Sequence, residues 1–112
     1  MTKQELIEVI RDYERFLRLA RNKLIEISQE IEDEQEFDLG VGVQEFATCD
    51  RNLLSLKTFV GEENYSEALK LIEAIRDGHE EVISLMNYKK YGLMDSGDNV
   101  LLVRSIDTII EK

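Results

Sequence analysis

Carboxylates are the residues of this chain most able to do chemistry, because the other catalytic residue types are scarce. The sequence contains one histidine, His79, and one cysteine, Cys49. Helical bundles that hold two metal ions place Glu-x-x-His pairs on two helices, whereas the residue three positions before the only histidine is Arg76. That kind of metal site is excluded in its usual form. We therefore expect His79 to be a hydrogen-bonded core residue and Cys49 to be a buried, unreactive one.

A magnesium site made of acidic pairs is the remaining enzymatic hypothesis. Helical nucleoside-triphosphate pyrophosphatases bind Mg²⁺ with Glu-x-x-Glu on one helix and an acidic pair on another, since oxygen ligands suit a hard cation. This chain offers Glu5 with Glu8, and Glu30 with Asp33. On one continuous helix these pairs would lie about 40 Å apart. They could not share an ion, so we rank a metal-dependent hydrolase last and expect no catalytic residue, metal or cofactor.

The densest charge lies between Glu30 and Asp38, where six carboxylates occur without a lysine or arginine. Acidic side chains near the C-terminal end of a helix oppose its dipole by about 0.3–1 kcal/mol each. Local helix stability therefore does not explain these carboxylates. Two explanations remain: the carboxylates keep the protein soluble, or they form a surface that binds a basic partner. The predicted partner-binding residues of this acidic segment are Glu30, Glu32, Asp33, Glu34, Glu36, Phe37, Asp38 and Leu39.

An apolar stretch follows these charges, and a pair of tyrosines elsewhere in the chain is a second candidate contact. From Phe37 to Val43 every second residue is apolar, which predicts an extended segment with one apolar face. That face either plugs the end of a bundle or meets another protein. Tyr88 and Tyr91 flank two lysines and are further predicted partner-binding residues, because tyrosine is a common interface anchor. Covering the end of the bundle would explain the two tyrosines equally well.

Helices must position these residues. The spacing of the apolar residues predicts that the first helix runs from Lys3 to Glu34. Thr2 and Glu5 form a capping box at its start. The apolar residues that follow are separated alternately by four and three positions, as on one face of a helix. They are Leu6, Ile10, Tyr13, Leu17, Ala20, Leu24, Ile27 and Ile31. Ile7, Phe16 and Ile25 widen the stripe, which favours a bundle over a two-stranded coil.

Three shorter helices are predicted after the first. One spans residues 43–60 and stops at Gly61 in a left-handed cap. The next starts with a cap formed by Asn64 and Glu67 and runs to Gly92, continuous but weakened at Gly78. The last is capped by Ser96 or Asp98. Its buried line is Leu102, Ile106 and Ile109. Residues 1–112 are thus expected to form one all-α domain, an up-and-down helical bundle of about four helices with a long N-terminal helix.

Composition narrows the expected function. The 24 acidic and 14 basic residues give a formal charge of −10, which disfavours direct binding of nucleic acid or anionic membranes and favours a partner with a basic surface. A single cysteine and the lack of a signal-peptide-like or membrane-spanning apolar run predict a cytoplasmic protein.

We therefore expect a small acidic modulator that binds a basic protein. It would be a stoichiometric inhibitor of the anti-defence or phage type, or an immunity protein, and its partner could act on nucleic acid. The alternative is a self-assembling helical scaffold, such as a homodimer formed along the first helix.

Overall fold

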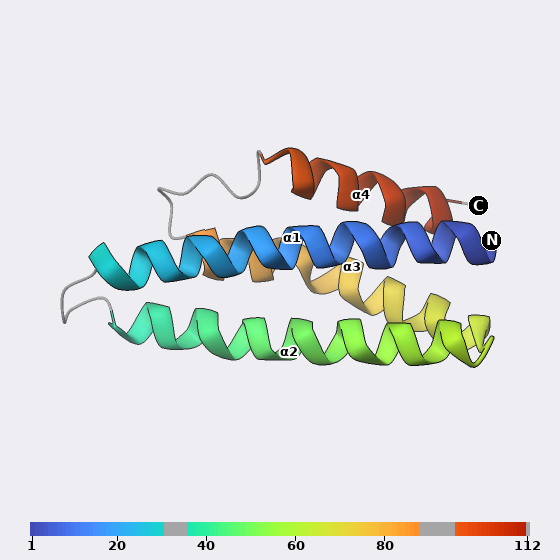
Figure 1. Ribbon diagram of the computed structural model, residues 1–112, viewed down its shortest axis with the longest axis horizontal. Coiled ribbons are helices and arrows are strands. Elements are labelled where there is room, and N and C mark those ends of the chain that lie inside the picture. The colour runs from blue at the N-terminus through green and yellow to red at the C-terminus, as the bar shows by residue number, and fades with distance from the viewer. Residues whose placement is uncertain (31–35, 88–95, 112) are drawn as a thin grey trace.

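The computed structural model describes residues 1–30, 36–87 and 96–111. Four α-helices follow one another: α1 (Lys3–Glu30), α2 (Glu36–Gly61), α3 (Tyr65–Asn87) and α4 (Gly97–Ile110). Successive helices alternate in direction along the bundle, and both ends of the chain lie at the same end of it (Figure 1). The predicted all-α up-and-down bundle with a long first helix is confirmed. None of the described helices combines the length and apolar character needed to cross a bilayer.

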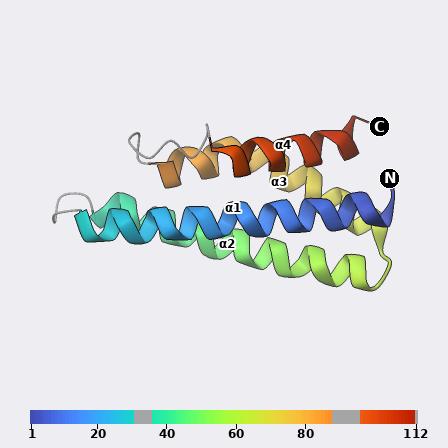
Figure 2. The same cartoon turned by 45° about the horizontal axis from the view of Figure 1, so that its top comes forward.

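α1 is the helix around which the bundle is organised. It packs along α2 on one side and α4 on the other, and α2 packs along α3, whereas α3 contacts α4 less extensively. Figure 2 shows α4 and α3 above α1 and α2 in the turned view. The Ser105 hydroxyl donates a hydrogen bond to Asp12, joining α4 to α1 across 93 residues of sequence. Because α3 contacts α4 less than the other neighbouring helices contact each other, the edge between α3 and α4 is the least tightly packed side of the bundle.

The core confirms most of the predicted helix faces. In α1, Leu6, Tyr13 and Leu17 are buried and Ile10 is half-buried. The largest fully buried side chains are Tyr13, Phe16, Leu6, Leu56, Ile72, Ile83, Leu102, Ile106 and Val9. The seam predictions at Leu24, Ile27 and Ile31 fall on side chains outside those that the structure describes. All three residues predicted to be buried on the last helix, Leu102, Ile106 and Ile109, are indeed buried.

The prediction that Ile25 belongs to the buried stripe of α1 is wrong. Its side chain is 51% exposed, while Val9, which the spacing did not single out, is 1% exposed. The start of α4 explains the difference. Asp98, in the first turn of α4, lines a cavity with Leu19 and Asn22, so α4 covers only the part of α1 on the N-terminal side of this level (Figure 1). Ile25 lies beyond that part.

α2 begins earlier than predicted, and the extended segment from Phe37 to Val43 does not exist. Residues 36–61 form one helix. The apolar alternation was ambiguous because Leu39, Val43 and Phe46 are also separated by four and three residues, which is the spacing of one helix face. Two glycines at positions 40 and 42 each cost about 1 kcal/mol relative to alanine inside a helix. They weaken the first turns of α2 without preventing them.

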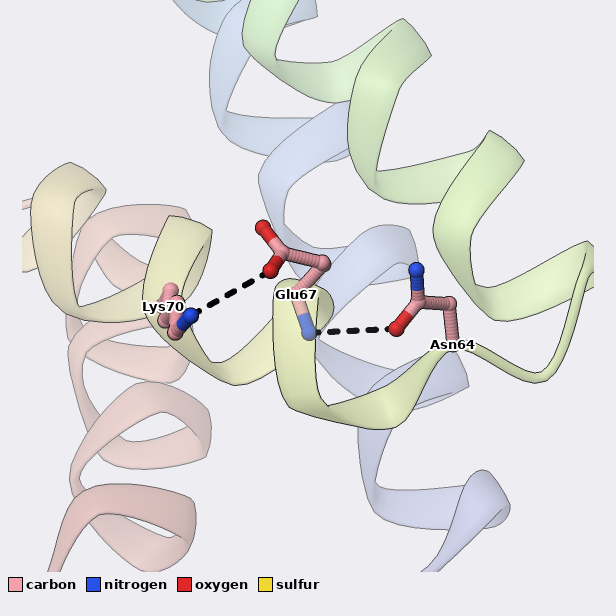
Figure 3. A network of polar contacts seen from close by, with 3 residues as sticks. All are labelled: Asn64, Glu67 and Lys70. Carbon is pink, nitrogen blue, oxygen red and sulfur yellow. Dashed lines mark hydrogen bonds and ion pairs between the residues drawn. The ribbon is translucent and has the colours of Figure 1, made fainter.

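Side-chain caps start three of the helices, as predicted. Thr2 and Glu5 cap α1 reciprocally: the Thr2 N–H donates to Glu5 Oε1 (2.9 Å) and the Glu5 N–H donates to Thr2 Oγ1 (3.1 Å). The Glu67 N–H donates to Asn64 Oδ1 (3.4 Å) at the start of α3, and Lys70 Nζ lies 3.3 Å from Glu67 Oε1 (Figure 3). Ser96 caps α4, with its hydroxyl accepting from the Asn99 N–H.

The turn between α2 and α3 differs from the predicted glycine cap. Glu63, not Gly61, has the left-handed backbone, with φ of 59°. The Asn64 N–H donates to the Phe59 carbonyl (2.8 Å) and the Glu63 N–H donates to the Val60 carbonyl (3.1 Å), which is the Schellman arrangement. Helical bonding continues past Gly61, since the Glu62 N–H donates to the Thr58 carbonyl. A glutamate therefore occupies the position that glycine usually takes.

α3 passes through Gly78 as one helix, as predicted. The residues of the first predicted helix after position 30, and those of the third after position 87, lie outside the described residues.

Candidate functional site

The predicted acidic segment lies at the junction of α1 and α2. Glu30 is the last residue of α1, and the four residues from Glu36 to Leu39 open α2, so both groups lie at one end of the bundle (Figure 1). Glu32, Asp33 and Glu34 lie outside the described residues, as do Tyr88 and Tyr91. For Glu30 and 36–39 the description extends to the backbone alone. Partner binding by this segment and by the tyrosines stays a prediction.

The acidic pairs that were considered as magnesium ligands, and rejected because of their separation, lie at the two ends of α1. Glu5 lies in the first turn of α1 and bonds to Thr2, whereas Glu30 ends the same 28-residue helix. The axial rise between them is about 40 Å. Among the residues that the structure describes, no group of three or more His, Cys, Asp or Glu is placed to hold a metal ion.

A groove of about 270 Å³ lies between α3 and α4. Its lining residues are Arg76, Asp77, His79 and Glu80 from α3, and Val103, Ile106 and Asp107 from α4. His79 and Ile106 are buried and form its floor, while Asp77 and Glu80 are exposed at its edge. The groove is thus a depression with a buried floor and a charged rim.

The rim of the α3–α4 groove carries more negative than positive charge. Arg76 Nε lies 3.6 Å from Asp107 Oδ1, and this ion pair bridges the two helices. Asp77 and Glu80 make no ion pair with any residue in the described ranges. On the face between α1 and α2, by contrast, two carboxylates pair with cations of the other helix. Arg21 lies 3.1 Å from Asp50, and Lys57 pairs with Glu14.

Apolar side chains of α4 are exposed beside the groove. Val103 is 38% exposed and lines it, and Val100, one turn earlier on the same face of the helix, is 47% exposed. Leu101 is also exposed. The sequence offered a signal that we did not interpret: residues 100–103 read VLLV. Four consecutive aliphatic residues cannot all face the core from one helix, and only Leu102 of the four is buried.

His79 forms the polar centre of the floor. Its Nε2 lies 2.7 Å from Asn99 Oδ1, and both residues are buried. An amide oxygen only accepts, so Nε2 carries the proton. The Phe16 ring meets the imidazole edge-on, with centroids 5.1 Å apart. The pKa of His79 is lowered from its usual 6.5 mainly by burial, which the bond to Asn99 and the charge of Glu80 only partly offset. The predicted core histidine is confirmed, and it is neutral near pH 7.

A second cavity of about 200 Å³ lies on the other side of His79, against α1 and α2. Tyr13, Cys49 and Asn52 line it, together with Gly78. Burial is the main reason that the pKa of Tyr13 is raised, and the neighbouring Cys49 raises it further. Cys49 is 4% exposed, as predicted. The hydroxyl and the imidazole facing this cavity are thus uncharged at neutral pH, an arrangement that serves packing.

Comparison of the chain with protein-family models, with curated proteins and with solved structures finds no match.

Proposed function

We propose that this chain is a small acidic module that binds one partner protein stoichiometrically through a basic surface of that partner. The observation that carries the proposal is a formal charge of −10 on 112 residues. A field of this size steers basic surfaces toward the protein and speeds their association. The exposed Val103 of α4 supports the proposal further, because it lines a groove together with Asp77 and Glu80, which make no ion pair in the described ranges.

The form of binding that we propose is inhibition. A row of carboxylates resembles the charge of a phosphate backbone, so an acidic module can occupy the basic cleft of an enzyme that acts on nucleic acid. An anti-defence or phage-type inhibitor, or an immunity protein, would act in this way in the cytoplasm. The module itself would not bind DNA or RNA, because it lacks the basic contacts that supply non-specific affinity.

Affinity capture followed by kinetics tests this function. The tagged chain is used to capture proteins from a lysate. The captured partner is identified and purified, and its sequence shows whether it is basic. Sedimentation then gives the stoichiometry of the complex. Association rates are then compared at two salt concentrations, near 50 and about 150 mM. We expect one basic partner at fixed stoichiometry, with association that slows as salt rises. A partner that is acidic, or a rate that ignores salt, contradicts the proposal.

The acidic segment is tested with the same partner. Glu30→Gln, Asp33→Asn, Glu34→Gln and Asp38→Asn together remove four negative charges and keep side-chain size. If this segment steers the partner, association slows and loses much of its salt dependence, and Phe37→Ala increases the dissociation rate. If it serves only solubility, neither rate changes.

Self-assembly is the second candidate, and exposed aliphatic side chains favour it. Leu54 and Ile25 are 67% and 51% exposed, so a second copy could cover them. The charge of −10 on each copy opposes this association. Sedimentation equilibrium over a range of concentrations distinguishes the two functions, since a scaffold increases in mass with concentration and the binding module stays monomeric without its partner.

A further inference from the structure

Resting on the proposed binding function, we propose that the α3–α4 groove is the docking site for a basic amphipathic helix of the partner. An aliphatic or aromatic side chain of that helix would enter the groove, and its lysines or arginines would meet Asp77 and Glu80. The proposed binding surface is thus the α3–α4 groove, which is separate from the acidic segment between α1 and α2.

The size of the groove favours a single side chain over a small molecule. Pockets for small molecules are typically about 300–1,000 Å³ and largely enclose their ligand. This groove has about 270 Å³ and is open along one side, where Val103 is 38% exposed. The buried part of its lining, His79 and Ile106, is uncharged at neutral pH. Such a depression suits an anchor residue presented by another protein.

Two rows of side chains define the shape of the partner. Asp77 and Glu80 lie one turn apart on α3, and Val100 and Val103 lie one turn apart on α4. Each row has an axial spacing of about 5 Å. A helix laid between them would place apolar residues over the valines and cationic residues, three or four positions apart, over the carboxylates. The acidic row on one side and the apolar row on the other thus match an amphipathic helix.

Charge decides between a foreign helix and a second copy of this chain. Asp77, Glu80 and Asp107 outnumber Arg76 at the rim, so the groove attracts positive charge. A second copy would bring another −10 toward it. The basic partner is therefore the complementary occupant.

A synthetic peptide probes the groove directly. We choose a peptide of about 18 residues, long enough to be helical, with leucine on one face and lysine on the other, and titrate it into the ¹⁵N-labelled full chain. The expected result is that amide shifts concentrate at residues 76–80 and 100–107. Shifts that concentrate in residues 36–61 instead would overturn the proposal. A peptide with glutamate in place of lysine should bind at least about tenfold more weakly.

Matched variants separate the groove from net charge. Asp77→Asn with Glu80→Gln should weaken peptide binding about two- to tenfold, because exposed ion pairs contribute modestly. Glu8→Gln with Glu62→Gln removes the same charge at exposed positions outside the groove and should change binding less than about twofold. Equal losses in both double variants would show binding by overall charge and overturn the proposal. Val103→Thr should also weaken binding, and Val100→Thr replaces it if thermal unfolding shows a damaged fold.

The captured partner distinguishes failure of the groove from failure of the function. A basic partner that binds wild type and the Asp77→Asn/Glu80→Gln variant equally overturns the groove and leaves the proposed function intact. Absence of any basic partner counts against the proposed function, whatever the peptide does. A wild-type dimer that Val103→Thr dissociates would show that a second copy occupies the groove and would overturn the assignment to a foreign helix.

Discussion

His79 donates a hydrogen bond from Nε2 to Asn99 Oδ1 over 2.7 Å, and this buried bond joins the middle of α3 to the first turn of α4. The bond crosses the side of the bundle on which neighbouring helices contact each other least. The same histidine forms part of the floor of the α3–α4 groove. The seating of α4 and the shape of the groove therefore depend on one titratable ring.

Stability should fall as the pH drops below about 6.5, the ordinary pKa of histidine. Burial lowers the pKa of His79 in the folded chain, so the unfolded chain binds a proton first. The contribution of His79 to the free energy of unfolding is complete above that pH. It decreases below that pH until the pH reaches the folded-state pKa. Urea unfolding at intervals between about pH 7.5 and 5 measures this, because most carboxylates titrate near 4. His79→Gln should flatten the profile, and an identical profile in that variant would contradict the assignment.

Leu17→Asp should unfold the bundle. Leu17 is 3% exposed in α1, and an unpaired buried carboxylate costs several kcal/mol against a total stability of about 5–15 kcal/mol. Ile25→Asp is the matched control, since it makes the same kind of change on the same helix at a side chain that is 51% exposed. It should change stability by about 0.5 kcal/mol. Circular dichroism during thermal unfolding measures both, and similar melting temperatures would mean that the buried face is misplaced.

Glu63→Gly should stabilise the protein by about 1 kcal/mol, because a left-handed backbone is costly for a residue with a side chain. Glu63 has φ of 59° and is the one described non-glycine residue with positive φ. Glu62→Gly, one position earlier, removes the same charge without that relief and should destabilise. Chemical denaturation gives both values. A gain in both variants would point to charge and not to backbone strain.

Gly78→Ala should also stabilise, by about 1 kcal/mol, the difference between the two residues inside a helix. Gly78 lies within α3, and a Cβ at this position would meet nothing within 4 Å. Ala74→Gly, one turn earlier and exposed, should destabilise by a similar amount. If Gly78→Ala lowers the melting temperature, then the cavity beside Tyr13 closes more tightly than its open lining indicates.

Arg21 shows how surface residues escape prediction from the sequence. Its position outside the apolar seam marks it as replaceable, yet its guanidinium pairs with Asp50 and lies 5.0 Å from the centre of the Phe46 ring. Both partners come from α2, 25 or more residues away in the sequence. Spacing within one helix carries no information on which residue of another helix will lie opposite.

Local signals, in contrast, were sufficient for the starts of α1, α3 and α4. The bonds between Thr2 and Glu5 join residues three positions apart, and their geometry follows from the helix alone. The segment 37–43 was mistaken because its apolar residues satisfy two periods at once. The groove was missed because it depends on where α3 and α4 diverge, and the aliphatic run at 100–103 indicates only that some side chains of α4 must face outward.

The hydrogen bond from Ser105 to Asp12 has a consequence for synthesis of the chain on the ribosome. These residues are 93 positions apart. At a translation rate of about 5–20 residues per second, synthesis of this interval takes about 5–20 s. Because α2 and α3 are made before α4, the side of α1 that packs against α4 lacks its cover during this interval. Its apolar residues are then available to other nascent chains and to chaperones. Closing of the bundle is in this sense timed by translation, and α1, made before the other three described helices, is among the last to be fully covered.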